Sequence, residues 1–454
     1  MPKSKEVFIC RLCGDASPKW QGQCPACGEW NTLASHSVPA GGAARRATAP
    51  GGAASATSTL ATESLEAPPR TGSGSAELDR VLGGGLVRGS VTLLGGDPGI
   101  GKSTLMLQTA AALESSGPVL YATGEESLQQ VALRARRLGL SGSGTRLIAE
   151  TGVERIIEAA AQCGAHVLIV DSIQTTWSAA VESAPGAVAQ LRECTAMLVR
   201  HAKQSGTAVV LVGHVTKEGQ IAGPRVLEHM VDTVLYFESD TGSRYRVLRS
   251  VKNRFGAANE IGVFAMAEQG LREVSNPSAM FLSRGPEAAP GSVVTVLREG
   301  TRSLLIEVQV LADASPGGNP RRVAVGIDGN RLTMLLAVAH RHGGLALHLH
   351  DVFANVVGGV RIAETAADLS IVLAARSSLE DRAVAHEAIA FGEIGLAGEI
   401  RPVPFGEERL REAAKHGFRT AIVPLANVPK RPPEGMRVHG VRRLVEAFAA
   451  ERGA

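Results

Sequence analysis

The chain of 454 residues has few aromatic residues and no long uninterrupted apolar segment. Phe, Trp and Tyr make up 4% of it, which disfavours an extended surface for stacking on bases but leaves binding through phosphates open. No apolar run reaches the roughly 20 residues that a membrane-spanning helix requires, so we expect no membrane partner. The start, MPKSKEVFIC, has no apolar core or cleavage site of a secretion signal, and we expect a cytoplasmic protein.

Net charge and cysteine content are also low. The formal charge of +3 does not by itself predict a nucleic-acid partner, so any basic surface must be local. Four of the six cysteines stand in two C-x2-C pairs, which is typical of a metal site in a reducing compartment rather than of a disulfide framework. The length allows roughly three domains.

The paired cysteines are Cys10, Cys13, Cys24 and Cys27, in the spacing C-x2-C-x10-C-x2-C. A glycine follows each pair and permits the tight turn that directs backbone amides towards the thiolates. Four thiolates complete a closed tetrahedron around Zn²⁺, which predicts a structural rather than a catalytic metal. Residues 1–33 have almost no core, so metal binding would supply their folding free energy. The alternative is two chance pairs.

Composition divides the remainder of the chain into three parts. Residues 34–66 are almost entirely Ala, Gly, Ser, Thr and Pro, which predicts a flexible linker. Residues 67–275 alternate apolar strands with helical segments, typical of an α/β fold in which helices cover both faces of a parallel sheet. After a Pro/Gly-rich junction, a second α/β region occupies residues 280–454.

A phosphate-binding motif, G-x-x-x-x-G-K-[ST], follows the strand VTLLG and opens a helix. It comprises Gly96, Asp97, Pro98, Gly99, Ile100, Gly101, Lys102, Ser103 and Thr104. Its glycines let backbone N–H groups converge on phosphate, and the helix N-terminus adds a partial positive charge. We expect Lys102 to contact the β- and γ-phosphates of ATP and Ser103 to bind Mg²⁺.

Three further polar residues follow apolar strands of the same region. Asp171 ends HVLIVD, where open α/β sheets bind ligands, and is expected to orient Mg²⁺ through water. Glu125, in YATGEES, is the candidate for positioning the attacking water. His214, in VVLVGH, is a candidate sensor of the γ-phosphate. Each has a plainer alternative: a strand-ending Asp, acids near a helix N-terminus, and a core histidine.

The segment RSVKNRFG places two cations, Lys252 and Arg254, at the tip of a strand that alternates polar and apolar residues. Taken alone, this pattern is typical of a solvated strand end.

The motif order resembles the bacterial RadA (Sms) family of DNA repair proteins. It is carried by the four-Cys unit, LDRVLGGGLVRGSVTLLGGDPGIGKSTL, YATGEES, LIVDSIQT, GHVTKEGQIAGPRVLEHMVD and VKNRFG. The resemblance implies a RecA-like ATPase core and hexameric rings with nucleotide at each subunit seam. It also implies DNA-stimulated ATP hydrolysis on single-stranded and branched DNA, with branch migration of strands paired by RecA.

In such rings Lys252 and Arg254 are expected to reach the neighbouring subunit's ATP and stabilise the charge of the transferring phosphoryl group. Phe255 would anchor the strand end, and Gly256 would free the backbone after it. This interpretation replaces the solvated strand end once the resemblance is included. The sequence leaves open whether both cations act on phosphate or one of them contacts DNA.

DNA contacts are expected in loops that follow the core strands. Lys217 and Arg225 lie in KEGQIAGPR, where RecA-like cores carry a DNA-binding loop, and the segment WSAAVESAPGAV is a second candidate. Nothing in either segment reads base edges, so little sequence specificity is expected. The alternative is a surface loop with two cations and no ligand.

Residues 351–417 resemble the proteolytic domain of Lon, whose nucleophile is a Ser activated by a Lys. These two positions fall on Ala366 and Glu407, and Ser370 and Lys415 lie off the motif. We therefore expect an inactive, scaffold-like domain without peptidase activity. A further hypothesis directs its basic residues towards DNA, among them Arg361, Arg376, Arg401 and Arg409.

Three functions compete at this point. The first is a DNA-dependent ATPase motor that acts on recombination intermediates. The second is an ATP-gated module that binds DNA or RecA without translocation. The third is an ATP-dependent protease, which the substituted Lon positions disfavour.

Overall fold

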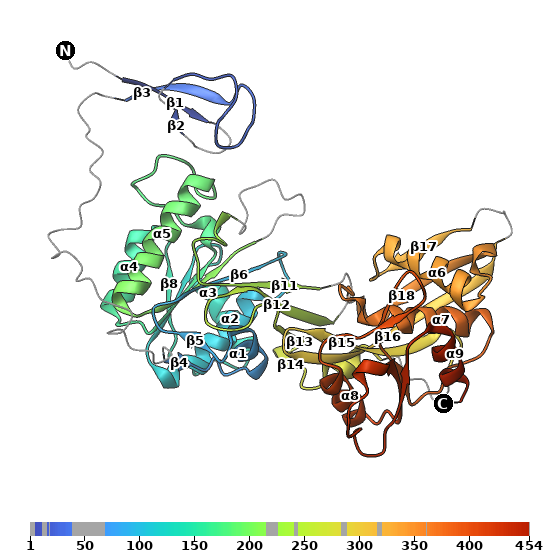
Figure 1. The fold of residues 1–454 in the computed structure, drawn as a ribbon. Coiled ribbons are helices and arrows are strands. Elements are labelled where there is room, and N and C mark those ends of the chain that lie inside the picture. Colours follow the sequence, from blue (N-terminus) through green and yellow to red (C-terminus); the bar gives the residue numbers. More distant parts are fainter. Residues whose placement is uncertain are drawn as a thin grey trace, which may run out of the picture. The chain divides into compact units, whose positions relative to one another are not determined.

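The structure is a computed structural model that describes residues 5–10, 16–17, 19–38, 69–214, 226–239, 244–282, 288–315, 320–359 and 361–453. The chain divides into two compact units (Figure 1). The first extends to residue 239 and includes 244–258 and 264–272, whereas the second includes 259–263 and the chain from 273 onward. Among the described helices, none combines the length and apolarity needed to cross a bilayer.

A nine-stranded sheet forms the centre of the first unit. Its order is β14 (Gly270–Glu273), β13 (Ile261–Ala267), β12 (Tyr245–Asn253), β11 (Thr233–Glu238), β6 (Val91–Gly96), β10 (Ala208–Val212), β9 (Val167–Asp171), β7 (Val119–Thr123) and β8 (Arg146–Ala149). The six strands from β11 to β8 are parallel, and β12 is antiparallel to β11. The carboxyl ends of the parallel strands therefore meet at one edge.

Helices cover both faces of this sheet (Figure 1). They are α1 (Ala76–Leu82), α2 (Lys102–Leu113), α3 (Leu128–Arg137), α4 (Val153–Gln162) and α5 (Val188–Ser205). Strand side chains alternate between the two layers. In β10, for example, Val209 and Leu211 pack in the core with α4 and α5, whereas Val210 and Val212 pack in the core with α1, α2 and α3. The continuous apolar strands thus bury both faces.

Two small sheets lie in the N-terminal part of the chain. β1 (Lys5–Cys10) pairs antiparallel with β2 (Ala16–Ser17) and β3 (Leu33–Val38). Further along, β4 (Arg70–Thr71) pairs with β5 (Leu86–Val87).

The second unit has a seven-stranded sheet. Its order is β17 (Arg322–Val325), β18 (His350–Val356), β16 (Arg302–Ala314), β15 (Ser292–Glu299), β19 (Ala388–Ala390), β22 (Thr420–Pro424) and β23 (Arg437–Val441). The helices of this unit are α6 (Gly329–Gly343), α7 (Asp368–Leu379), α8 (Gly406–Lys415) and α9 (Leu444–Arg452). A two-stranded pair, β20 (Glu393–Ile394) and β21 (Ile400–Arg401), adjoins it.

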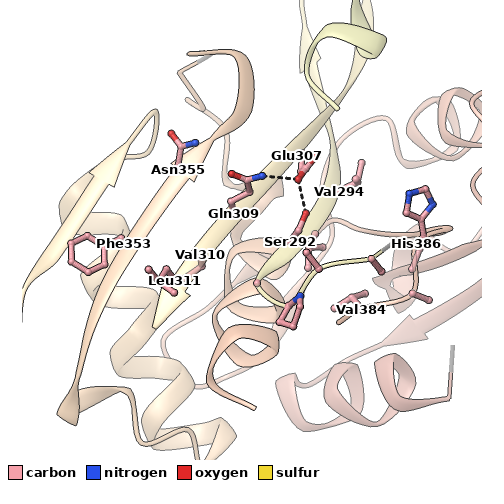
Figure 2. A pocket seen from close by; sticks show the side chains of 17 residues that line it. Ser292, Val294, Glu307, Gln309, Val310, Leu311, Phe353, Asn355, Val384 and His386 are labelled. Carbon is pink, nitrogen blue, oxygen red and sulfur yellow. Dashed lines mark hydrogen bonds between the residues drawn. The ribbon is translucent and has the colours of Figure 1, made fainter. Parts of the chain in front are cut away.

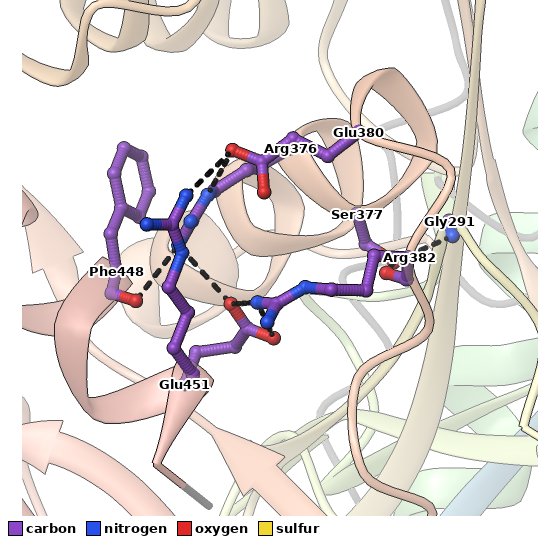
Figure 3. A network of polar contacts seen from close by, with 8 residues as sticks. Gly291, Arg376, Ser377, Glu380, Arg382, Phe448 and Glu451 are labelled. Carbon is purple, nitrogen blue, oxygen red and sulfur yellow. Dashed lines mark hydrogen bonds and ion pairs between the residues drawn. The ribbon is translucent and has the colours of Figure 1, made fainter.

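A buried ion network fastens α9 to α7 (Figure 3). Arg376 donates to the Phe448 carbonyl (2.8 Å) and to Glu451 (3.1 Å), and its guanidinium lies over the Phe448 ring. Arg382 also pairs with Glu451. Because Arg376 is 3% exposed, the hypothesis that it faces DNA is wrong.

Arg409 is likewise internal, at 1% exposed. It pairs with Glu364 (2.7 Å) and donates to the carbonyl of Val296. The hypothesis that it contacts DNA is therefore also wrong. Arg361 and Arg401 are exposed, although Arg401 pairs with two neighbouring carboxylates.

Candidate functional site

The phosphate-binding loop connects β6 to α2 at the carboxyl edge of the parallel strands. Gly99 (φ 76°) and Gly101 (φ 119°) adopt left-handed backbone conformations that L residues with a Cβ rarely reach. A Cβ on Gly101 would also lie 3.1 Å from the Met266 methyl group. Gly101 is the N-cap of α2. The first N–H groups of that helix have no acceptor within the helix and can therefore donate to a phosphate held by the loop.

Lys102 is the centre of a hydrogen-bonded group beneath the loop. Its Nζ donates to the carbonyl oxygens of Gly96 (2.7 Å) and Asp97 (2.9 Å) and contacts His214 Nδ1 at 3.1 Å. The residue is 3% exposed. Ile100, between the loop glycines, packs in the hydrophobic core instead.

Burial lowers the pKa of Lys102 from 10.5 to about 8. The nearby carboxylates of Asp171, Glu125 and Asp97 oppose this effect but do not cancel it. Desolvation of an ammonium disfavours its charged form, so an additional anion beside Lys102 would favour that form and raise the pKa again.

His214 links Lys102 to Glu125. Because the Lys102 ammonium is a donor, Nδ1 of His214 accepts, and Nε2 can donate to Glu125 Oε1 at 3.2 Å. Ser172 also donates a hydrogen bond to this carboxylate, and Gln174 donates to the His214 carbonyl (3.1 Å). The carboxylate of Glu125 remains 41% exposed, which leaves it accessible to water.

Asp171 ends β9, which lies between β10 and β7 in the sheet, and is 7% exposed. The Tyr121 hydroxyl donates to its Oδ2. Burial and the negative charge of Asp171 raise the pKa of Tyr121 well above its usual value, so the hydroxyl keeps its proton. The donor set of Asp171 and the Ser103 hydroxyl consists of the oxygen ligands that Mg²⁺ prefers.

One cavity of about 330 Å³ brings these groups together. It is lined by Pro98, Gly99, Gly101, Lys102, Ser103, Thr104, Thr123, Glu125, Glu126, Arg134, Arg137, Asp171 and His214. A second cavity of about 430 Å³ shares Thr104 and Arg137 with it and has apolar walls from Leu138 and Met266. The sequence analysis missed Arg134 and Arg137, although their spacing of three residues places both on one face of a helix.

Lys252 lies at the opposite edge of the sheet from this cavity. β12 is antiparallel to β11, so it carries Lys252 to the amino ends of the parallel strands. There Lys252 Nζ donates to the carbonyls of Glu228 (2.7 Å) and Val231 (2.8 Å). The residue after Val231, Asp232, donates its N–H to the carbonyl of Val91, so Lys252 Nζ lies near the level of Val91, at the start of β6. The five residues from Val91 to the loop span roughly 16 Å.

Arg254 shares this edge and is exposed. Its guanidinium pairs at 3.2 Å with Asp232, whose other oxygen accepts from the N–H of Val91 (3.1 Å). Burial lowers the pKa of Lys252, and the charge of Arg254 adds to that effect. Neither cation contacts the phosphate-binding loop of its own chain.

The turn after these cations is held by residues that the sequence analysis did not single out. Arg70 donates to the carbonyls of Phe255 and Gly83, and the side-chain oxygen of Asn253 accepts from the N–H of Phe255 (2.9 Å).

That Gly256 frees the backbone after the strand end stays a prediction, but the structure gives this glycine a packing role as well. A Cβ on it would lie 3.0 Å from the Gly83 Cα and 3.0 Å from Asn253 Nδ2, so it permits close packing. Phe255 is half-buried, and its backbone is held by Arg70 and Asn253; anchoring of the strand end by its ring stays a prediction.

The N-terminal cysteines form a cluster compatible with a metal. The Sγ atoms of Cys10, Cys24 and Cys27 lie within 4.8 Å of one another, and those of Cys10 and Cys27 are 3.7 Å apart. Thiolates at about 2.3 Å from a tetrahedral zinc would be separated by about 3.8 Å, so the geometry fits Zn²⁺. Cys13 lies outside the described residues, as do the DNA-contact candidates Lys217 and Arg225.

The positions that correspond to the Lon nucleophile and base carry no such groups. Ala366 is 1% exposed, and Glu407 pairs with Arg411 at 3.6 Å. Ser370 is buried and donates to the Ala367 carbonyl (2.7 Å).

A cavity of about 540 Å³ in this unit includes none of these positions in its lining. Figure 2 shows that Ser292 and Gln309 both donate to its buried carboxylate, Glu307 (2.7 and 2.9 Å).

Comparisons with known proteins agree with this architecture. Family models match residues 8–35 (rubredoxin metal binding domain), 62–220 (AAA domain) and 337–427 (subunit ChlI of Mg-chelatase). The predicted fold class is thereby confirmed: an N-terminal zinc-ribbon unit, a P-loop ATPase core and a Lon-like α/β domain.

Curated relatives extend the match to nearly the whole chain. The DNA repair protein RadA of Pseudomonas aeruginosa is 58% identical over 99% of both chains, and that of Escherichia coli is 56% identical over 98% of both. The RadA of Bacillus subtilis is 47% identical over 100% of both chains. The chain therefore belongs to the DNA repair protein RadA family.

Proposed function

We propose that this protein is a DNA-dependent ATPase that acts on recombination intermediates during DNA repair. The observation that carries the proposal is the single cavity in which Lys102, Glu125 and Asp171 meet. It contains a cation for phosphate, a water-accessible carboxylate and a buried carboxylate suited to Mg²⁺. These are the groups that phosphoryl transfer to water requires.

Each group has a separate task in this reaction. The loop N–H groups and Lys102 bind the β- and γ-phosphates, and Glu125 accepts a hydrogen bond from the attacking water and orients it. Ser103 and Asp171 would hold Mg²⁺, which neutralises phosphate charge when bound. His214 contacts both Lys102 and Glu125, so it would sense whether the γ-phosphate is present. The adjoining cavity with Leu138 and Met266 would receive the base of ATP.

The cations of the KNRFG segment support action between subunits. Lys252 and Arg254 lie at the edge opposite to their own phosphate-binding loop, so they would reach only the nucleotide of another copy. That arrangement requires head-to-tail contacts, which close into a ring when the rotation permits. A hexameric ring is our expectation for the active assembly.

DNA is the proposed substrate because the relatives are DNA repair proteins. Lys217 and Arg225 remain the candidate contacts to the phosphate backbone of single-stranded and branched DNA. We propose that ATP turnover drives branch migration of strands paired by RecA. Cations without base-reading groups predict binding that weakens strongly with salt and depends little on sequence.

The experiment is an ATPase assay with and without single-stranded DNA, followed by strand displacement on a tailed fork. Wild-type protein should hydrolyse ATP faster with DNA and displace the strand. Lys102→Ala and Glu125→Gln should each lose turnover, and Glu125→Gln should retain ATP binding. Normal turnover in Lys102→Ala would overturn the assignment.

An ATP-gated binding module is the second candidate, and it predicts DNA affinity that follows nucleotide state without strand displacement. Peptidase activity has little support, since the Lon-type positions lack a nucleophile. Casein degradation that survives Lys102→Ala but not Ser370→Ala would revive it.

A further inference from the structure

Helix α3 begins immediately after the two glutamates at the nucleotide cavity. Its N-cap is Ser127, whose side chain accepts from the N–H of Gln130, while the Gln130 side chain accepts from the N–H of Ser127. This capping box fixes the start of the helix. Arg134, about two turns from that start, lines the cavity.

The adjacent glutamates point to different partners. Glu125 contacts Ser172 and His214, on the side of the catalytic groups. Glu126 instead pairs with Arg134. The backbone of Glu126 is held by Thr123, whose hydroxyl accepts from its N–H (3.1 Å) and donates to its carbonyl (3.0 Å).

The cavity contains more cationic groups than the phosphate-binding motif supplies. Its charged lining consists of the cations Lys102, Arg134 and Arg137 and the anions Glu125, Glu126 and Asp171. Arg134 is also close enough to affect Tyr121, the donor to Asp171. Burial and the charge of Asp171 raise the pKa of Tyr121, and the charge of Arg134 lowers it by a smaller amount. A guanidinium in this position matches the geometry of phosphate oxygens, which it can bind through two N–H groups.

We propose that Arg134 is a ligand of the nucleotide's phosphates supplied by the same subunit, and that Glu126 competes with those phosphates for it. This inference rests on the proposed function, because it requires ATP in the cavity. When phosphate binds, Arg134 exchanges the Glu126 carboxylate for phosphate oxygens. Nucleotide binding thus releases Glu126 at the N-terminal turn of α3.

A purely structural role for the pair makes a different prediction. The two side chains are 21% and 30% exposed, and ion pairs that solvent reaches contribute little to stability. If the pair only fastened α3, neutralising either partner would change stability slightly and in the same direction. Nucleotide affinity would then remain unchanged in both variants.

The test measures the dissociation constants of Mg-ATP and of tripolyphosphate, a probe without base or ribose, for the full-length protein. Arg134→Gln should weaken both by about tenfold or more, and Arg134→Lys should recover part of the loss. Glu126→Gln should strengthen both, because the competing carboxylate is gone. Arg136→Gln is the matched control: this neighbouring residue of α3 is exposed and outside the cavity lining, so both affinities should be unchanged.

Three results would overturn the proposal. They are wild-type affinity in Arg134→Gln, loss of Mg-ATP binding with tripolyphosphate binding retained, and weaker binding in Glu126→Gln. Thermal melts verify that each variant is folded. Failure of the proposed function is distinguishable, because Lys102→Ala would then bind Mg-ATP as tightly as the wild type.

Discussion

At the scale of single residues, burial disfavours the charged form of Lys102 more than the nearby carboxylates favour it. Burial lowers its pKa to about 8, against the attraction of nearby carboxylates. The ammonium is therefore partly deprotonated near pH 8, and its protonation is coupled to whatever anion lies beside it.

We expect nucleotide binding near pH 8 to take up protons. Phosphate favours the charged form of Lys102 and raises its pKa, so up to about half a proton per site would be bound at pH 8. Affinity should consequently fall as the pH rises above 8. Calorimetry at pH 8 in two buffers of different ionisation enthalpy measures the uptake. Lys102→Arg, which stays protonated, is the control, and equal enthalpies in both buffers for the wild type would contradict the expectation.

At the scale of elements, the turn after β12 is fixed against the end of α1. Arg70 spans the two segments through the carbonyls of Gly83 and Phe255, and Asn253 donates to the carbonyl of Val81 (3.3 Å). The position of Lys252 and Arg254 thus depends on the backbone packing of Gly83 and Gly256 as well as on strand pairing.

Gly256→Ala should displace this turn. The added Cβ would lie 3.0 Å from the Gly83 Cα, and overpacking of this kind costs about 1–3 kcal/mol. We expect lower ATPase activity with nearly unchanged affinity for Mg-ATP, because the phosphate-binding loop lies at the other edge. Ala257→Ser, at the next and exposed position, should be neutral in both assays. Wild-type activity in Gly256→Ala would contradict this expectation, because it would show that Lys252 and Arg254 work equally well with a shifted turn.

At the scale of the whole molecule, the two halves of the proposed reaction centre lie at opposite edges of one sheet. Five residues of β6 separate their levels, and the described contacts of Lys252 and Arg254 all lie at the edge away from the phosphate-binding loop. Under the proposed function, the complete site forms only between copies of the chain.

Mixing two inactive variants should therefore restore ATPase activity. Lys252→Ala supplies an intact phosphate-binding loop and Lys102→Ala supplies an intact Lys252, so roughly a quarter of the interfaces in a random equimolar mixture would be complete. The rate should rise above that of either variant alone and reach a maximum near equal amounts. A mixture no more active than its components would contradict action between subunits.

The sequence by itself determined the features that short segments encode. The loop from Gly96 to Thr104, the C-x2-C pairs and the alternation of apolar strands with helices depend on local backbone geometry and periodicity, which are readable in order along the chain. The positions of Asp171, Glu125 and His214 after apolar strands followed from one rule, that parallel strands present their carboxyl ends together.

Only the tertiary structure decided which distant groups touch. His214 lies between Lys102 and Glu125, Arg134 turns to Glu126, and Arg376 and Arg409 are buried although both were expected at a surface. Such pairings depend on how helices and loops pack over the sheet, since packing sets the direction and burial of each side chain. A one-dimensional pattern of charges does not contain that information.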